Sequence, residues 1–298
     1  MGEKPQVGWI GLGGMGSRMA KRLLDAGYPL TVYTRVPKKA QEFARSGARA
    51  AGSPREAASG SDIVLSSLTD DAAVEQVYLG PEGVLAGARP NALLVEMSTI
   101  LPQTARRVGQ AAQEKGTAFL DAPVSGSTLQ AETGQLVLLV GGDEKDFERA
   151  KPLFNVLGKG AYLMGAVGQG AAMKLVVNAL LGLGLQSLAE ALALGEKAGL
   201  ERGQLLDVLS QTAHVSPGQK AKMDNVRKGE YPPQFPVRLL HKDFRLILDQ
   251  AARLNVPMPV TAAAQQMFSI QAAKDGDTDC SAVIQLTLDL AGGAGGRA

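Results

Sequence analysis

The chain has 298 residues, of which 45% are hydrophobic and 20% charged, and its formal net charge is +2. This composition excludes a disordered chain, and the charge provides neither a basic face for nucleic acid nor an acidic tail. One cysteine, Cys280, and two histidines, His214 and His241, exclude a disulfide framework and a Cys/His metal cluster, so we expect no metal. With about 150 residues per domain, the length predicts two domains.

Strands and helices alternate through the first half of the chain. An apolar run at residues 6–10 ends in glycines and is followed by helical spacing up to residue 26. The alternation continues to about residue 164, which indicates parallel βαβ units with helices on both faces of one sheet. We expect strands at 6–10, 30–33, 62–68, 92–97, 117–121, 136–140 and 161–164, and helices at 15–26, 37–46, 70–78, 102–115 and from 143.

The pattern changes at residues 165–170, after which we find no convincing strand. Residues 171–198 form one long helical pattern that is apolar nearly all round. We therefore predict an α/β domain of residues 1–165 and an all-α domain of residues 166–298 that begins with a long interdomain helix. Further helices are expected at 202–212, 217–228, 236–254, 260–274 and 279–290.

Two observations bear on the location of the protein. The first residues run directly into a strand and show no signal-peptide pattern. The most apolar stretch, residues 175–189, contains Asn178, Gln186 and Ser187 and is shorter than the ~20 apolar residues of a membrane span. We expect a cytoplasmic protein with neither a membrane nor a nucleic acid as partner.

A glycine motif lies between the first strand and the first helix. The sequence Gly11-Leu12-Gly13-Gly14-Met15-Gly16 has the spacing G-x-G-x-x-G. Gly11 permits the tight turn, Gly13 lets the backbone approach a pyrophosphate, and Gly16 allows close helix–strand packing. A glycine-rich chain often produces this pattern, but the strand before it and the helix after it are the context that makes it specific. All six residues are predicted to bind a dinucleotide, in a Rossmann-type domain.

The end of the second strand decides which dinucleotide is expected. An acidic residue there would accept the ribose 2′-hydroxyl of NAD, but the chain has Tyr33-Thr34-Arg35 followed by Lys38, with no carboxylate. A guanidinium binds a 2′-phosphate through two hydrogen bonds. We therefore predict that Thr34, Arg35 and Lys38 contact the cofactor, with NADP preferred and NAD possible. The alternative is an ordinary solvated start of a helix.

A lysine and an asparagine interrupt the long apolar helix. Lys174 and Asn178 are one turn apart on the same face. One interpretation is a lysine whose ammonium reaches solvent near the start of the helix. The other is functional, because Lys174 follows the domain boundary, clefts between domains are preferred ligand sites, and a partly desolvated lysine suits proton donation to a carbonyl.

With these motifs, the sequence resembles the β-hydroxyacid dehydrogenase family over nearly its whole length. This family includes 3-hydroxyisobutyrate dehydrogenases, tartronate semialdehyde reductases and glyoxylate/succinic semialdehyde reductases. The resemblance implies an N-terminal Rossmann domain and a C-terminal helical domain joined by a long helix. The resemblance rests on five motifs: the glycine motif, Ser98-Thr99-Ile100, the stretch from Asp121 to Ser127, Gly170 through Lys174 to Asn178, and Lys242-Asp243.

The resemblance also assigns roles to individual residues. It implies that Lys174 is the catalytic lysine and that Asn178 lies in the substrate cleft. It implies that Ser125, Gly126 and Ser127 bind the substrate carboxylate, for which backbone N–H groups in a Gly/Ser turn are suited. The chain departs from the family at Ser127, usually glycine, and at Ala73, where several members carry asparagine. The resemblance also implies that four residues lie beside the cofactor: Leu68, Thr69, Thr99 and Lys242.

The predicted function is NADP-dependent interconversion of a small semialdehyde or keto acid and its hydroxy acid, with proton transfer by Lys174. One alternative is an imine reductase-like enzyme, which needs no site for a carboxylate. Another is a non-catalytic dinucleotide-binding scaffold, which needs no Lys174. The long helix has more apolar faces than one partner can cover, so we expect a homodimer or homotetramer.

Overall fold

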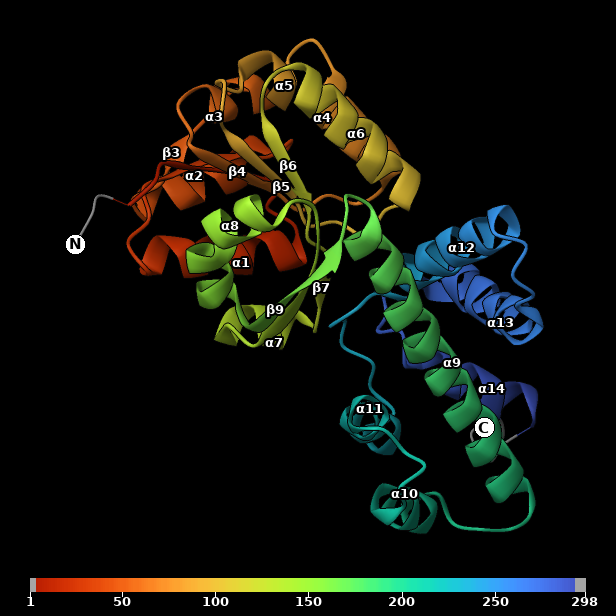
Figure 1. Cartoon of the computed structure of the whole chain (residues 1–298). Helices are drawn as coiled ribbons and strands as arrows, with labels where there is room; N and C mark the ends of the chain where they lie inside the picture. Colours follow the sequence, from red (N-terminus) through yellow and green to blue (C-terminus); the bar gives the residue numbers. More distant parts are fainter. Residues whose placement is uncertain (1–3, 293–298) are drawn as a thin grey trace. The chain divides into compact units, whose positions relative to one another are not determined.

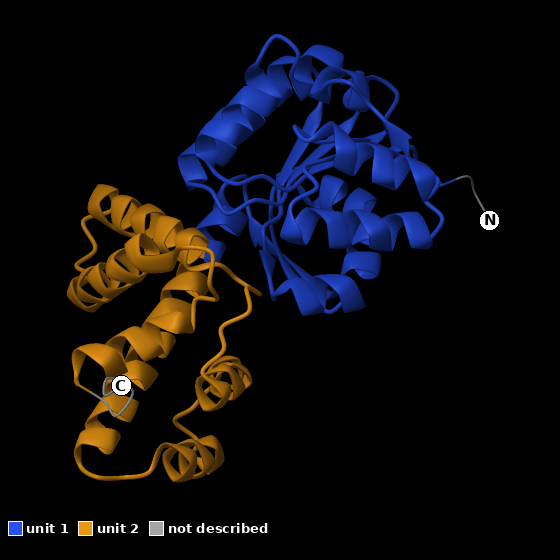
Figure 2. Ribbon diagram, turned by 180° about the vertical axis from the view of Figure 1, so that it is seen from behind, with its two compact units in different colours: residues 1–174 blue, residues 175–298 orange. Residues whose placement is uncertain are grey.

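The computed structural model describes residues 4–292, which form parts of two compact units. Unit 1 spans residues 1–174 and unit 2 spans residues 175–298 (Figure 2). The predicted boundary at residue 166 lies just before helix α9 (Gln169–Lys197), whereas the division between the units lies within this helix. Lys174 is therefore the last residue of unit 1, and Asn178 belongs to unit 2.

Unit 1 is built on a nine-stranded sheet whose first six strands are parallel (Figure 1). Their order is β3-β2-β1-β4-β5-β6, which is that of a doubly wound dinucleotide-binding fold. The order reverses between β1 and β4, and ligands of such sheets bind outside the carboxyl ends of the strands at this point. The strands are β1 (Val7–Ile10), β2 (Leu30–Tyr33), β3 (Arg49–Ala50), β4 (Ile63–Ser66), β5 (Leu93–Glu96) and β6 (Ala118–Asp121).

The other edge of the sheet differs from the prediction of uniformly parallel strands. Strand β8 (Leu136–Gly141) runs antiparallel to β6 and to β7 (Val124–Ser125), while β9 (Gly158–Gly165) is parallel to β8. A parallel crossover requires a dozen or more residues, usually including a full helix. The connection between β7 and β8 contains only the six-residue helix α7 (Thr128–Thr133), so the chain turns back instead.

Both faces of the parallel strands are buried under helices. Along β5, Leu93 and Val95 pack into one hydrophobic cluster and Leu94 into another on the opposite face. This alternation explains why the strands are apolar throughout. The remaining helices of unit 1 are α1 (Gly14–Asp25), α2 (Pro37–Arg45), α3 (Pro54–Ser59), α4 (Asp71–Leu79), α5 (Val84–Gly87), α6 (Pro102–Glu114) and α8 (Glu144–Leu157).

Unit 2 is helical, as predicted. Its core gathers buried side chains of α9 with Phe244 and Phe268, whose rings lie 5.0 Å apart between centroids. The other helices are α10 (Arg202–Gln211), α11 (Pro217–Lys228), α12 (Val237–Arg253), α13 (Pro259–Asp275) and α14 (Ala282–Leu290).

A buried ion pair, which the sequence did not predict, joins α11 to the start of the last helical segment. Lys222 Nζ lies 2.8 Å from Asp279 Oδ2, and the same carboxylate accepts the backbone N–H groups of Gln234 and Phe235. Burial alone would raise the pKa of Asp279, but Lys222 and these hydrogen bonds hold it below its ordinary value. Asp279 is therefore ionised at neutral pH and ties three segments of unit 2 together.

Helix α9 is long and apolar enough to cross a membrane by length and composition alone. It has 29 residues, and its most apolar window has a mean hydropathy of 1.6. This differs from the sequence prediction, in which the apolar stretch was too short for a span. Half of that window is buried inside the molecule, and a single such helix is weak evidence for a membrane span.

Candidate active site

The carboxyl ends of neighbouring parallel strands bring most of the predicted cofactor residues to one edge of unit 1. The glycine motif follows β1 and opens α1, as predicted. Thr34 and Arg35 follow β2, and Lys38 lies in the first turn of α2. Leu68 and Thr69 follow β4, and Thr99 follows β5. Lys242 lies on α12 in unit 2.

Two of the motif glycines are required by the fold itself. Gly11 has φ +96°, and a Cβ at this position would lie 2.2 Å from the carbonyl oxygen of Ser67. A Cβ on Gly16 would lie 2.1 Å from the carbonyl oxygen of Gly11. Any side chain at either position would displace the backbone, so these two glycines set the turn and the close packing of α1 against β1 and β4.

Gly13 has no such structural reason to be glycine. Its φ is −74°, which any residue adopts, and a Cβ there would meet nothing within 4 Å. No side chain caps the N-terminus of α1, and its first turn contains no acidic residue. Free N–H groups and the positive end of the helix dipole attract an anion at this point. The open space at Gly13 therefore fits a pyrophosphate that approaches the backbone closely.

A groove of about 810 Å³ begins at this loop. Its lining includes Leu12, Gly13 and Gly14 and continues along α1 and α2. Beside it, the start of α2 has an unusual charge distribution. Arg35 is exposed, Lys38 lies in a first turn that holds no acidic residue, and no side chain caps this helix. Because the helix dipole disfavours cations at an N-terminus, an anion bound at this point would offset their charge.

Glu96, for which no role was predicted, holds two of the loops that are predicted to line the cofactor. This buried carboxylate accepts the hydroxyl of Ser66 and, at 2.6 Å, the N–H of Ser98. Ser98 Oγ in turn accepts the N–H of Leu68 at 2.7 Å. Burial raises the pKa of Glu96 to about 7, against the lowering effect of these hydrogen bonds. The loops after β4 and β5 are thus fixed by one buried group.

The predicted carboxylate-binding loop connects β7 to α7. Ser125 ends β7, Gly126 has φ +134°, and Ser127 precedes α7. The N–H and hydroxyl of Ser127 both donate to Gln130 Oε1, at 2.9 and 2.6 Å. A substrate carboxylate bound at the Ser127 N–H would therefore replace the Gln130 oxygen. The hydroxyl contact to Gln130 exists only because this chain has serine at the position where the family usually has glycine.

Lys174 lies in the second turn of α9 and is only 9% exposed. Asn178 follows one turn later and is 2% exposed. Asn178 Nδ2 donates to Asp243 Oδ2 at 2.5 Å, and Lys242 Nζ lies 2.9 Å from Asp243 Oδ1. Asp243 was not predicted as a site residue, although the pair Lys242-Asp243 is one of the motifs that the family shares.

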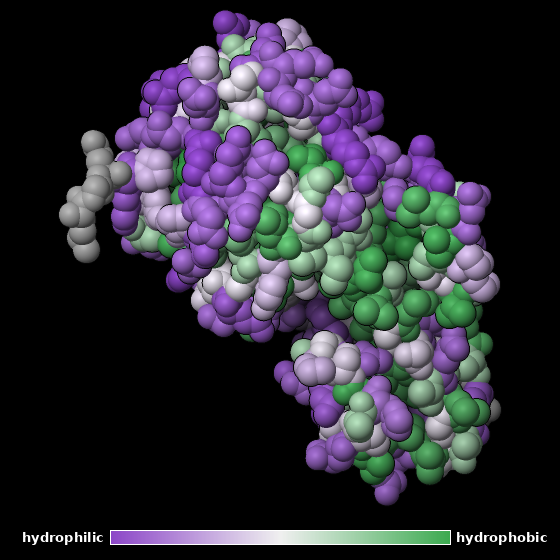
Figure 3. Space-filling model, in the orientation of Figure 1, coloured by the Kyte–Doolittle hydropathy of each residue, from purple (hydrophilic) through white to green (hydrophobic). Residues whose placement is uncertain are grey.

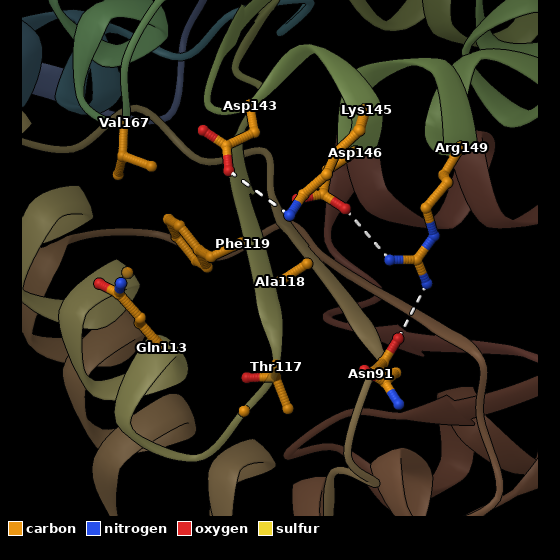
Figure 4. Close-up of a pocket in the computed structure, with 12 residues that line it drawn as sticks. Asn91, Gln113, Thr117, Ala118, Phe119, Asp143, Lys145, Asp146, Arg149 and Val167 are labelled. Atoms are coloured by element: carbon orange, nitrogen blue, oxygen red, sulfur yellow. Dashed lines mark hydrogen bonds and ion pairs between the residues drawn. The ribbon is translucent and has the colours of Figure 1, made fainter.

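A second groove of unit 1, of about 560 Å³, contains none of the predicted site residues (Figure 4). Its charged groups are paired with one another. Arg149 lies 3.1 Å from Asp146 and donates to the Asn91 carbonyl at 2.8 Å, and Lys145 lies 3.9 Å from Asp143. This groove therefore presents no unsatisfied charge to a ligand. Within residues 4–292, no three His, Cys, Asp or Glu side chains are placed to hold a metal ion.

Comparisons with known proteins agree with this geometry. Residues 6–168 match the NAD-binding domain of 6-phosphogluconate dehydrogenase, and residues 168–287 match the NAD-binding domain of NADP-dependent 3-hydroxyisobutyrate dehydrogenase. The chain is 37% identical to 2-(hydroxymethyl)glutarate dehydrogenase of Eubacterium barkeri, over 98% of each chain. It is 38% identical to glyoxylate/succinic semialdehyde reductase 1 of Arabidopsis thaliana, over 94% of this chain and 97% of the relative.

A solved structure is similar over almost the same length. The 3-hydroxyisobutyrate dehydrogenase of Mycobacterium tuberculosis, solved with L-serine, superposes with a TM-score of 0.87 at 31% identity, covering 95% of this chain and 99% of that one. The fold of both units therefore also occurs in a known dehydrogenase. The chain belongs to the β-hydroxyacid dehydrogenase family of NAD(P)-dependent oxidoreductases.

Proposed function

We propose that this enzyme interconverts a small semialdehyde or keto acid and the corresponding hydroxy acid, with NADP as the preferred cofactor. The observation that carries the proposal is Lys174, a buried lysine held one turn after the start of α9. The bound nicotinamide supplies or accepts the hydride. Lys174 donates a proton to the carbonyl oxygen during reduction and takes it back during oxidation. Asn178, one turn further along, helps to orient the reacting oxygen and is itself held by Asp243.

The substrate class follows from the loop at Ser125–Ser127. The turn has glycine in the middle at φ +134°, and its backbone N–H groups and serine hydroxyls suit a carboxylate, which at Ser127 would take the place of the Gln130 oxygen. The names of two relatives, a hydroxymethylglutarate dehydrogenase and a glyoxylate/succinic semialdehyde reductase, describe acids of this kind. An imine substrate does not require such a loop.

A substrate panel tests this proposal directly. Glyoxylate, succinic semialdehyde, tartronate semialdehyde and 3-hydroxyisobutyrate are assayed with NADPH or NADP⁺ and with NADH or NAD⁺, and a cyclic imine is included. We expect turnover with at least one of the acids and none with the imine. Turnover of the imine alone would replace the proposal with the imine reductase alternative, and binding of NADPH without any turnover would favour the scaffold.

The preference for NADP is supported by the charges after β2. Arg35 is exposed and Lys38 begins an uncapped helix without acidic residues, which is the environment that a 2′-phosphate neutralises. The second strand ends without the carboxylate that would select the ribose of NAD. We also propose a cytoplasmic location, which suits a substrate and cofactor that are both soluble.

We further propose that two copies of the chain associate through α9. Its exposed apolar side chains recur along one stripe, with Val176 at 53%, Leu180 at 70% and Leu194 at 74% exposure. Figure 3 shows apolar surface over the helical unit, where α9 lies. A single copy leaves this stripe in water, and contiguous exposed apolar surface marks an interaction site. A second copy with the same stripe buries it symmetrically.

Replacing Leu180 with glutamate is expected to shift the protein toward monomer. Burial of one leucine contributes about 1.5–3 kcal/mol, and a symmetric interface contains the residue twice. Light scattering over a range of concentrations measures the change. Val208→Glu is the matched control, because Val208 lies on α10 and is 60% exposed. A wild-type protein that stays monomeric at every concentration contradicts the proposal.

A further inference from the structure

The first turn of α9 lacks the side chains that normally cap the N-terminus of a helix. The helix begins at Gln169, so Gly168 is its N-cap residue and Ala171 its third residue. In a capping box, the side chains at these two positions accept each other's backbone N–H groups. Glycine and alanine have no side-chain oxygen, so both N–H groups need an acceptor from elsewhere in the chain.

Asp121, at the end of β6, supplies both acceptors. Its Oδ1 accepts the N–H of Gly168 at 2.6 Å, and its Oδ2 accepts the N–H of Ala171 at 2.7 Å. The side chain is 1% exposed, so these charge-assisted bonds are shielded from water. The negative charge also lies at the positive end of the helix dipole. One carboxylate from β6 thus accepts the two N–H groups that the two side chains of a capping box would otherwise accept.

The backbone around this cap is closely packed. A Cβ on Gly170 would lie 2.3 Å from the Leu139 carbonyl oxygen and 2.7 Å from that of Asp121. The start of α9 therefore lies directly against the ends of β6 and β8. Asp121 also begins the stretch that leads to the loop at Ser125, so one strand end fixes both elements.

We propose that Asp121 is a positioning residue for the reaction: its carboxylate fixes the first turn of α9 and thereby places Lys174, one turn later, relative to the loop at Ser125–Ser127. The proposal rests on the proposed function, in which Lys174 transfers the proton. Asp121 itself touches neither substrate nor cofactor in this role. It acts through the helix, because Lys174 follows Ala171 by three residues on a rigid element.

The test compares Asp121→Asn with the wild-type protein in three measurements. An asparagine keeps one acceptor oxygen but turns an amide NH₂ toward the second N–H. Hydrogen–deuterium exchange of the peptide that spans residues 165–175 is expected to accelerate about tenfold or more, because charge-assisted bonds are lost. The single-turnover rate is expected to fall about 10- to 100-fold, as for a small misplacement of a reacting group. The affinity for NADPH is expected to stay unchanged, since the glycine loop is untouched.

Two further variants complete the design. Asp143→Asn is the matched control, since Asp143 also precedes a helix but makes no capping hydrogen bond and is exposed. Asp121→Glu keeps the charge and both oxygens and is expected to recover part of the rate. If Asp121→Asn does not fold, the same three measurements are made on Asp121→Glu. Its losses of exchange protection and of rate are expected in the same direction but smaller, because the charge and both oxygens remain.

The outcomes separate this inference from the proposed function. Unchanged exchange at residues 165–175, a near-wild-type rate, or a parallel loss of NADPH affinity overturns the positioning role. If Lys174→Ala keeps its rate, the proposed function fails. Faster exchange in Asp121→Asn would in that case still establish the cap, but without a role in proton transfer, and the inference as stated would be overturned.

Discussion

Replacing Lys174 with alanine is expected to slow single-turnover hydride transfer by about 10²–10⁴-fold, the usual contribution of a general acid. The lysine is 9% exposed, so solvent water cannot readily take its place as proton donor. NADPH affinity should change little, because the glycine loop and the loops after β4 and β5 are built from other segments. The fold should survive, since alanine has high helix propensity.

Two variants sharpen this experiment. Lys174→Arg keeps the charge but should not restore the rate, because a guanidinium does not release its proton. Lys197→Ala is the matched control, since Lys197 is the other lysine of α9 and lies exposed in its last turn. A near-wild-type rate for Lys174→Ala with bound NADPH would remove the lysine from the mechanism.

Replacing Arg35 with aspartate is expected to weaken NADPH binding by about 10- to 150-fold, because one charge-assisted contact to a phosphate contributes about 1.5–3 kcal/mol. NADH binding should change little or improve, since a carboxylate at this position accepts a ribose hydroxyl. Fluorescence titration with each cofactor measures both affinities without requiring a substrate.

The control for this variant lies at the other end of the same helix. Arg45→Asp makes the identical exchange at an exposed position in the last turn of α2. It should leave both affinities unchanged. An equal loss for NADPH and NADH in Arg35→Asp would mean that Arg35 stabilises the loop and does not select the cofactor.

The parallel strands and long helices were predictable because their signals are local. Strand β2 and helix α11 begin and end where the sequence places them. The short elements α3 and α7 were missed, although each carries a signal. Ser53 accepts the N–H of Glu56, and Ser127 donates to Gln130, so both helices begin with a polar residue that contacts the third residue along.

The direction of β8 and the buried acids of the site were not predictable in the same way. Alternation of strand and helix does not specify strand direction when the connecting helix has a single turn or two. Glu96 and Asp121 each end an apolar run, which marks them as acids at the carboxyl edge of the sheet. Glu96, however, accepts the Ser98 N–H and the Ser66 hydroxyl, and Asp121 accepts two backbone N–H groups of distant residues. The sequence pattern does not indicate these contacts.

Glu96 and Asp121 occupy facing register positions on adjacent strands, so two buried acids lie side by side in the sheet. Burial raises the pKa of Glu96 from 4.5 to about 7 and that of Asp121 from 3.8 to about 6. At a pH between the pKa of the unfolded state and that of the folded state, these carboxyl groups hold protons in the native protein that they do not hold in the unfolded chain. Stability from these groups is therefore greatest below the unfolded values and declines as pH rises toward 7. Unfolding in weakly acidic solution consequently releases protons, and the heat measured by calorimetry will depend on the ionisation enthalpy of the buffer that takes them up.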